Sequence, residues 1–405
     1  MKKMLIALMS IFVLLFTVSC GSEKTETKEG KIKIRFATWD NAEDLDDQQK
    51  MVDAFNAGQD KIEVVLEAYG SNYDTKITAS MGSGDAPDVM YMWNYPKYSK
   101  GLLPLDELIS KEGKEFGENY YEALWNYNSF EGKKLGMPVG YTTHVLYFNK
   151  DLFDSAGVSY PTPEWTWNDV VEASRKITNA ENKVFGFAFP LKPDPYDYEM
   201  FAWSNGSAFV GEDGNPVGYL NSENTIKPFE VFQTMIKENI ATTTEDYGEK
   251  SFILGKTAMY INGAWSLNRL KEKGVNFGVE LLPKFNGNES ASILSSSGVS
   301  ISATSKNPEA AWEFVKYWTS AEMNKNRLGY ELPVLKTVVD ELKITEDPIM
   351  NKFYTMLEKS VKYTPASFVT QDWSELSEKL ELALEQILNK NSFVDPKVAL
   401  EEASK

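Results

Sequence analysis

Side chains that commonly take part in catalysis are scarce in this chain of 405 residues. It contains one histidine, His144, and one cysteine, Cys20. This excludes zinc sites built from histidine and cysteine, and nucleophilic systems that need more than one imidazole. His144 precedes a strand-like run at 145–148, so we expect a structural histidine, or one at the edge of a ligand site, in place of a general base. The sequence also lacks the glycine-rich phosphate loop, the GxGxxG motif and the GxSxG motif.

Aromatic residues beside polar ones are a more abundant signal. Phe, Trp and Tyr make up 13% of the chain. A pyranose has an apolar face of C–H groups that stacks on an aromatic ring, while its hydroxyls bond to amides and carboxylates. Trp39–Asp40 and Trp93–Asn94 each follow a predicted strand, and Trp265 follows a Gly–Ala turn after the predicted strand 258–261. Since open α/β sheets bind ligands at strand ends, we expect some of these rings to face a ligand.

The elements that must position these residues alternate between strand and helix patterns, which predicts an α/β fold with mostly parallel sheets. Residues 32–37 and 61–66 have strand patterns, and residues 44–56 carry apolar side chains at helical spacing. Gly82–Ser83–Gly84 ends a helix because glycine accepts a positive φ at the C-cap, and Pro87 then forces an extended entry into the strand 88–92. We expect this stretch to be structural.

Cys20 lies where an apolar N-terminal segment meets a polar stretch. Lys2 and Lys3 precede the apolar run 5–18, which is short for a transmembrane helix and typical of a secretory signal. Thr17–Cys20 resembles the lipobox of bacterial lipoproteins, although the motif usually has leucine at the position of Thr17. We expect a signal peptide over 1–19, a lipidated Cys20 and a polar tether over 20–31. An ordinary secretory signal with an incidental cysteine is the alternative.

Length and net charge limit the number of lobes and the classes of partner that the chain can have. The part of the chain after residue 31 is too long for one ordinary core and suits two lobes. The net charge is −17, which argues against nucleic acid or anionic lipid headgroups as partners. Asp44, Asp46 and Asp47 form an acidic run that we interpret as a helix N-terminal charge pattern in place of a metal site. We therefore expect no metal and no cofactor.

Several short segments occur in a fixed order: Ala79–Val89, Gly136–Pro138, Leu146–Phe153, Pro163–Asp169, Gly255–Met259, Asn262–Trp265, Gly298–Ile301 and Lys306–Phe314. In this order they resemble the solute-binding proteins of carbohydrate ABC importers, the family 1 group of extracellular solute-binding proteins that are similar to maltose-binding protein. Members carry a helix that ends in MASGDAPDV or close to it. The resemblance covers nearly the whole chain after the signal, but it does not distinguish among substrates.

The resemblance implies a two-lobe clamshell of α/β class with mixed, mostly parallel sheets. Lobe 1 would hold residues 32–139 and 297–342, and lobe 2 would hold residues 140–296 and 343–405. A ligand that bridges both lobes binds the closed state better and shifts the population toward closure. The membrane subunits of an ABC permease would then recognise the closed form.

The resemblance also implies a sugar site. The tryptophan that matches Trp265 typically stacks on sugar in this family. Tyr196 and Tyr198, in a proline-interrupted loop over 192–199, and Trp373, before a helix at 374–388, resemble further aromatic subsites. Core packing or helix capping is the alternative role for these and for the remaining candidates. The full predicted ligand-binding set is Trp39, Asp40, Trp93, Asn94, Tyr141, Tyr196, Tyr198, Trp265, Arg327, Glu331 and Trp373.

These expectations combine into a monomeric, lipid-anchored receptor on the extracytoplasmic face of the cell membrane, or in the periplasm, with a carbohydrate ligand and no catalysis. One alternative is a glycerol-phosphate-type solute in the same fold, which would need a cationic site. Another is a secreted glycosidase, because its paired carboxylates come from distant parts of a chain and spacing does not test for them. A sensory role that uses the same closure is a third.

Overall fold

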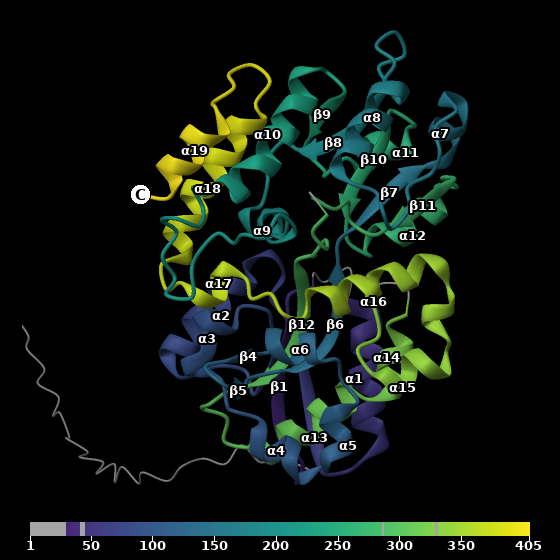
Figure 1. Ribbon diagram of the computed structural model, residues 1–405. Coiled ribbons are helices and arrows are strands. Elements are labelled where there is room, and N and C mark those ends of the chain that lie inside the picture. Colours follow the sequence, from purple (N-terminus) through teal and green to yellow (C-terminus); the bar gives the residue numbers. More distant parts are fainter. Residues whose placement is uncertain (1–29, 41–44, 286, 329–330) are drawn as a thin grey trace, which may run out of the picture.

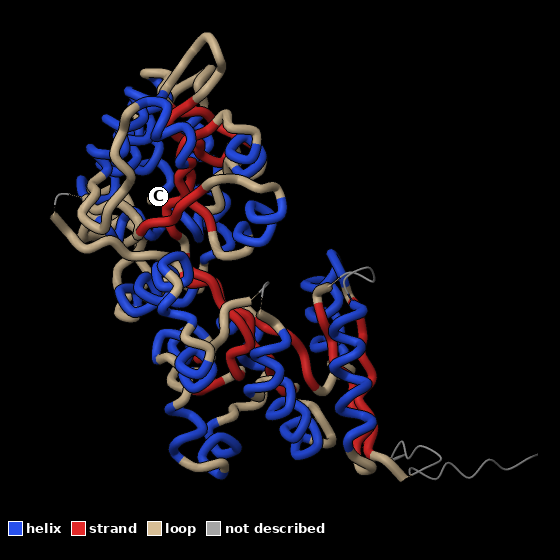
Figure 2. Tube along the Cα trace, turned by 90° about the vertical axis from the view of Figure 1, so that its right-hand side faces the viewer, coloured by secondary structure: helices blue, strands red, loops and turns tan. Residues whose placement is uncertain are grey.

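The computed structural model of the protein describes residues 30–40, 45–285, 287–328 and 331–405. Cys20, the predicted signal peptide and most of the predicted tether lie outside the described residues. The described chain forms two bodies, one above the other, each built around a five-stranded sheet (Figures 1 and 2). We call the body around β1 the first lobe and the body around β7 the second lobe.

The first sheet has the strand order β2-β1-β3-β12-β6. Its strands β1 (Ile32–Thr38), β2 (Ile62–Ala68) and β3 (Val89–Met92) are parallel. The strand β12 (Leu294–Ile301) is antiparallel to both β3 and β6 (Met137–Thr143). The strands predicted at 32–37, 61–66 and 88–92 are thereby confirmed.

The second sheet repeats this pattern with other strands, in the order β9-β8-β10-β7-β11. Its parallel strands are β8 (Phe185–Pro190), β9 (Ala241–Thr244) and β10 (Thr257–Asn262). The strand β7 (Val145–Asn149) is antiparallel to β10 and to β11 (Phe277–Glu280). In each sheet the first and third parallel strands are neighbours, so their carboxyl ends meet at one edge.

Helices surround both sheets (Figure 1). The helix α2 ends as the sequence predicts, with Gly84 left-handed at φ 75° as its C-cap. The helix α8 begins at a capping box in which the side chains of Thr166 and Asp169 bond each other's backbone N–H. The first lobe has α1 (Leu45–Gly58), η1 (Gly70–Asn72), α2 (Tyr73–Ser83), α3 (Tyr95–Tyr98), η2 (Ser99–Gly101), α4 (Asp106–Lys111), α5 (Lys114–Glu118), α6 (Glu122–Tyr127), α13 (Pro308–Trp318), α14 (Ala321–Asn326), α15 (Lys336–Glu341) and η3 (Ile344–Glu346), with the small hairpin β4 (Ser129–Phe130) and β5 (Lys133–Lys134).

The second lobe has its own helices, and two more lie where the lobes meet. The second-lobe helices are α7 (Lys150–Ala156), α8 (Trp167–Ile177), α9 (Pro195–Ser204), α10 (Glu223–Lys237), α11 (Glu249–Ile253), α12 (Ser266–Glu272), α18 (Trp373–Leu388) and α19 (Pro396–Ala403). The helix α16 (Pro348–Ser360) packs against β6 of the first sheet and against β7 and β11 of the second. The short helix α17 (Ala366–Val369) contacts α3 and α9.

Three chain segments cross between the lobes in the described residues, and hydrogen bonds join them. The backbone N–H of His144, between β6 and β7, donates to Ser292 Oγ at 2.6 Å. The N–H of Ser292, between β11 and β12, donates at 2.8 Å to Oγ of Ser360, the last residue of α16. The three crossings thus form one hydrogen-bonded junction.

The first sheet extends further along the chain than the predicted lobe boundaries. Residues 140–143 of β6 pair with residues 294–297 of β12, so the chain leaves this sheet after Thr143 instead of Val139 and re-enters it at Leu294 instead of Ser297. Because α16 contacts both sheets, it belongs to neither lobe alone. None of the helices in the described ranges has the length and apolar character needed to span a membrane.

Candidate functional site

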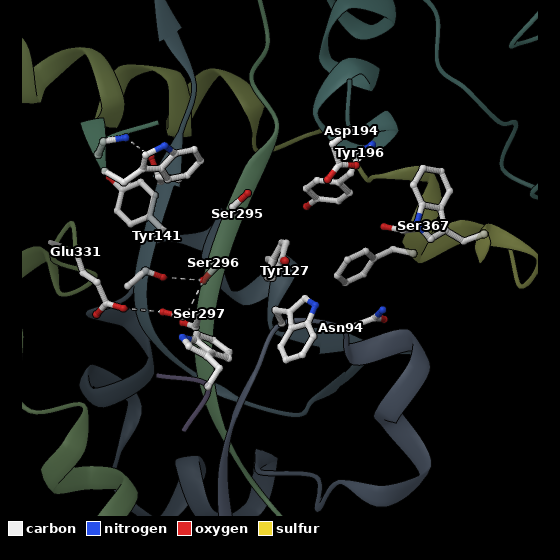
Figure 3. Close-up of a pocket in the computed structure, with 18 residues that line it drawn as sticks. Asn94, Tyr127, Tyr141, Asp194, Tyr196, Ser295, Ser296, Ser297, Glu331 and Ser367 are labelled. Carbon is white, nitrogen blue, oxygen red and sulfur yellow. Dashed lines mark hydrogen bonds between the residues drawn. The ribbon is translucent and has the colours of Figure 1, made fainter. Parts of the chain in front are cut away.

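A pocket of about 660 Å³ lies between the lobes, and residues from both of them line it (Figure 3). Its walls are formed by the turns that follow strands of each sheet and by one face of β6 and β12. The lining residues are Trp39, Trp93, Asn94, Tyr127, Gly140, Tyr141, Thr142, Asp194, Tyr196, Ala264, Trp265, Ser295, Ser296, Ser297, Glu331, Ser367, Phe368 and Trp373.

Most of the ligand-binding residues predicted from the sequence lie together in this pocket. Those that line it are Trp39, Trp93, Asn94, Tyr141, Tyr196, Trp265, Glu331 and Trp373. Asp40, Tyr198 and Arg327 do not line it. That the lining residues contact a ligand stays a prediction.

The rings of Trp39 and Trp93 belong to a packed aromatic cluster in the first lobe. Trp39 follows β1 and Trp93 follows β3, and their ring centroids are 5.5 Å apart. Trp39 also packs on Tyr91 at 4.7 Å and on Tyr73 at 5.7 Å. Tyr73 donates from its hydroxyl to the Tyr91 carbonyl at 2.6 Å. Each tryptophan is half-buried, so one part of the ring is fixed by protein while another faces the pocket.

Asn94 and Asp40 are both engaged by the protein near these rings. The Asn94 side chain caps α3 by accepting from the backbone N–H of Lys97 at 3.1 Å. The Asp40 carboxylate accepts from Thr38 Oγ1 at 3.2 Å and from the amide of Gln48. These bonds turn Asp40 toward the start of α1, which explains why it is absent from the pocket lining.

Trp265 stands out from the second lobe at the end of β10, and its side chain is 51% exposed. Its indole packs edge-on against the His144 ring, with centroids 5.6 Å apart. Gly263 lies directly beneath the indole, and a Cβ at that position would lie 2.5 Å from the ring atom Cζ3. The Asn–Gly–Ala–Trp segment therefore needs glycine so that the ring can fold over the turn.

The helix α9 separates two tyrosines that the sequence places in one loop. Residues 195–204 are helical, with Pro195 at the first position and Asp194 as N-cap accepting from the Tyr196 N–H at 3.0 Å. Two residues apart on a helix point in nearly opposite directions. Tyr196 therefore faces the pocket, where its hydroxyl donates to the Leu294 carbonyl at 2.7 Å, while Tyr198 is buried against Phe201.

Glu331 lines the pocket, whereas Arg327 lies behind it and contacts Glu331. Glu331 Oε1 accepts from Ser297 Oγ at 3.1 Å, and Oε2 lies 3.7 Å from Arg327 Nε. The Arg327 side chain is 3% exposed; it covers the Trp318 ring and donates to the Trp318 carbonyl at 2.5 Å. Gly140 leaves room for Glu331, since a Cβ there would lie 2.5 Å from the Glu331 carboxyl carbon. Arg327 is thus behind the pocket wall.

Several residues that line the pocket were not among the ligand-binding residues predicted from the sequence. They are Tyr127, Thr142, Asp194, Ser295, Ser296, Ser297, Ser367 and Phe368. Ser367 and Phe368 lie on α17, which is held by the buried Glu199 carboxylate of α9: its Oε2 accepts from the Ala366 N–H at 2.7 Å. A polar residue before Pro195 was an available signal for Asp194 as a helix cap. The serines carried no comparable signal.

Carboxyl groups around α9 have altered acidity. The protein surrounding Asp194 removes part of its hydration, which together with the charge of Asp197 raises the pKa of its carboxyl. Burial raises the pKa of Asp197 and of Glu199 to about 7 each. Burial also lowers the pKa of His144 to about 4, so the imidazole, whose Nε2 is 4.0 Å from Asp197 Oδ2, is neutral near pH 7. That His144 is structural, or lies at the edge of the ligand site, stays a prediction.

The charges of the pocket lining are acidic. Asp194 and Glu331 line it, and none of the lining residues that the structure describes is a lysine, an arginine or a histidine. Within the described ranges, no group of three or more histidine, cysteine or acidic side chains is placed to hold a metal ion. The arrangement offers stacking surfaces together with hydroxyl, amide and carboxylate partners, which is chemistry suited to a neutral polyhydroxy ligand.

Comparisons with known proteins agree with this architecture. Residues 42–325 match the family described as bacterial extracellular solute-binding protein. The sequence is 26% identical over 350 residues to a maltotriose-binding protein of Pyrococcus abyssi (strain GE5 / Orsay), covering 82% of this chain and 72% of that protein. It is 25% identical over 422 residues to a galactooligosaccharide-binding protein of Bacillus subtilis (strain 168), covering 100% and 96%.

A solved structure gives the same fold. The ABC substrate-binding protein Lmo0181 from Listeria monocytogenes, in complex with cycloalternan, superposes with a TM-score of 0.76 at 24% identity, covering 92% of this chain and 97% of that one. The α/β clamshell of two lobes that the sequence predicts is therefore confirmed.

Proposed function

This chain belongs to the bacterial extracellular solute-binding proteins, and we propose that it captures a sugar or an oligosaccharide outside the cytoplasm and delivers it to an ABC importer. One observation carries the proposal: eight aromatic residues and several hydroxyl-bearing side chains line one pocket between the lobes. Rings stack on the C–H faces of a pyranose, and hydroxyls, amides and carboxylates bond to its polar edge. The names of the two relatives, which refer to maltotriose and to galactooligosaccharide, support the same ligand class.

The proposed mechanism is closure of the lobes around the ligand. Tyr141 and Trp93 reach the pocket from the first lobe, and Tyr196 and Trp265 reach it from the second. A ligand that contacts both walls binds the closed arrangement better than the open one and shifts the population toward it. The closed form would then be the state that the membrane subunits of the importer recognise.

A glycerol-phosphate-type ligand is less well supported. A phosphodiester carries a negative charge and favours a site with arginine or lysine. Arg327, which lies behind the pocket wall, is already paired with Glu331 and bonded to the Trp318 carbonyl. A phosphate in this pocket would instead meet Asp194 and Glu331. The acidic lining therefore favours a neutral saccharide.

We infer that the protein has no catalytic activity. The two pocket carboxyls lie on different sides of the pocket in Figure 3, and each is engaged by the protein, Asp194 as the cap of α9 and Glu331 with Ser297 and Arg327. An incubation of the purified protein with oligosaccharides, followed by chromatography, tests this. Release of shorter sugars would establish a glycosidase instead.

We also propose that Cys20 carries the lipid that anchors the protein at the membrane. The support is its position after an apolar segment of signal type. Export of a Cys20→Ser variant from a bacterial host is the test. The unchanged protein should fractionate with membranes and the variant should be soluble; membrane association of both would contradict the anchor.

The ligand class is tested by a thermal-shift screen of the purified protein against saccharides, polyols and glycerol phosphodiesters. A ligand that binds the native state raises the unfolding midpoint by mass action. We expect a saccharide to produce the largest shift. A clear shift with a phosphodiester and none with any saccharide would overturn the sugar assignment.

A further inference from the structure

A second cavity adjoins the pocket at its Glu331 end. It has a volume of about 400 Å³, and Ala264 and Glu331 line both spaces. Figure 3 shows Glu331 on one side of the first pocket and Ser367 on the opposite side, so the second cavity extends the first one away from Ser367. Both volumes fall in the range of about 300–1,000 Å³ that is common for ligand sites.

Both lobes form the walls of this second cavity. The helix α12 of the second lobe contributes Leu267, Asn268 and Lys271. The opposite wall comes from the loop after α14, from the end of α15 with η3, and from the start of α16. In Figure 1 the helices α14, α15 and α16 lie below α12. A molecule in this space would thus contact both lobes, as in the first pocket, and would favour closure in the same way.

The side chains of the second cavity combine aliphatic surface with hydrogen-bonding groups. Leu328 and Leu342, each 40% exposed, supply the aliphatic surface. Asn268 and Lys271 present an amide and an ammonium group to the cavity. Lys343, Asp347 and Glu331 also line it, and they are already bonded to Glu346, to the backbone N–H groups at the start of α16 and to Ser297, respectively. Of the described residues that line it, none is aromatic. The cavity therefore offers polar partners and an aliphatic surface, where the first pocket offers aromatic rings.

We propose that the second cavity is a further saccharide compartment, so that the ligand is an oligosaccharide whose chain continues past Ala264 and Glu331 onto α12. This inference rests on the proposed function. We assign a saccharide to this cavity because the cavity adjoins the first pocket at Ala264 and Glu331. The next sugar units of an oligosaccharide bound on the aromatic rings would reach the cavity, and their hydroxyls would find amide, ammonium and carboxylate partners there. The first pocket holds the units that stack, and the second adds affinity for longer chains.

The test compares ligands of one linkage and increasing length. The purified full-length protein is titrated calorimetrically with maltose through maltoheptaose, and with the β-linked galactooligosaccharide series. We expect affinity to rise with length beyond the chain that fills the first pocket. Two variants on the exposed face of α12 probe the second cavity: Asn268→Phe, which places a bulky ring at its wall, and Lys271→Ala, which removes a donor. Glu272→Ala is the matched control, since Glu272 is exposed on the same helix and does not line the cavity.

The expected result is a loss of about tenfold in affinity for the longest bound oligosaccharide in each cavity variant, as for one or two lost hydrogen bonds. The shortest bound ligand should change by less than about twofold, and the control should match the unchanged protein at every length. Equal losses at all lengths, or an affinity that does not depend on length, would overturn the compartment but leave the sugar assignment intact. Failure of every saccharide to bind would overturn the proposed function itself.

Discussion

In both lobes, residues of the pocket follow the first and third parallel strands of the sheet. Trp39 and Trp93 follow β1 and β3 in the first lobe, and Asp194 and Trp265 follow β8 and β10 in the second. The two walls differ in how these groups are held. In the first lobe Trp39 packs on three other rings, and Glu331 has Arg327 behind it.

The second lobe leaves two of its pocket residues, Trp265 and Asp194, more exposed than the tryptophans of the first lobe. Trp265 is 51% exposed and packs on the single ring of His144 among the described residues. Asp194 has no basic residue among the described ones that line the pocket beside it. The difference suggests that the first wall is rigid before the ligand arrives, while the second wall gains its packing from the ligand. Preorganisation of one wall lowers the ordering cost of binding.

The largest effect should come from Arg327→Met. The substitution leaves the partly buried Glu331 carboxylate without its ion-pair partner and removes the bond to the Trp318 carbonyl, so it is expected to lower the free energy of unfolding by about 4 kcal/mol at pH 7. Urea denaturation measures this. Since loss of the cation raises the pKa of Glu331 further, part of the loss should be recovered toward pH 5. A Glu331→Gln, Arg327→Met double variant that is no more stable than Arg327→Met would argue that the pair is unimportant.

Trp39→Ala should affect the folded state itself. It removes a half-buried ring from contact with Tyr73, Tyr91 and Trp93, which is expected to lower the free energy of unfolding by about 3 kcal/mol. Affinity for the sugar should fall as well. If the variant lost affinity but kept its unfolding midpoint, the first wall would be no more rigid than the second.

Trp265→Ala should affect binding alone. The ring gains most of its burial from the ligand, so its loss is expected to cost about 2 kcal/mol of binding free energy, or about thirtyfold in Kd. The unfolding midpoint of the ligand-free protein should change little, because the side chain is largely exposed. Calorimetric titration and thermal unfolding give the two values. Leu254→Ala, at an exposed position outside this pocket, is the control.

A smaller effect should appear in the pH dependence of stability. Burial raises the pKa of Glu199 to about 7 from its ordinary value of 4.5, so between these pH values the native state holds a proton that the unfolded state has released. Unfolding free energy should therefore fall as pH rises through this window, by up to about 1.4 kcal/mol per pH unit for this group. Glu199→Gln should reduce that slope.

Asp197→Asn is the companion variant for this experiment, because burial also raises the pKa of Asp197 to about 7. Each substitution should remove part of the slope, and the two together should remove most of it. A slope that neither variant changes would mean that these carboxyls do not control the pH dependence.

Strand order along the chain and the rings that follow strands were predictable from local sequence. Trp39, Trp93 and Trp265 directly follow strand patterns, and the carboxyl ends of neighbouring parallel strands meet at one edge. The end of α2 at Gly84 was predictable for the same reason, since a glycine C-cap acts within one turn. These signals depend on residues only a few positions apart.

Local sequence did not predict the helix α9. Pro195 suggests a loop, but proline is also favoured in the first turn of a helix, and there the side chain of Asp194 caps the free N–H groups. Once the segment is helical, Tyr196 and Tyr198 point to opposite sides. Only one of the two tyrosines can then reach the pocket.

The sequence by itself determined the family, the α/β class and the rings at the strand ends, because each depends on patterns within short segments. Only the tertiary structure decided that Ser295, Ser296 and Ser297 line the pocket and that Arg327 lies behind it. The serines reach it because β12 pairs with β6, which is more than a hundred residues earlier in the chain. Arg327 lies behind the wall because Trp318 and Glu331 hold its guanidinium there. Such placements depend on non-local packing, which no short segment encodes.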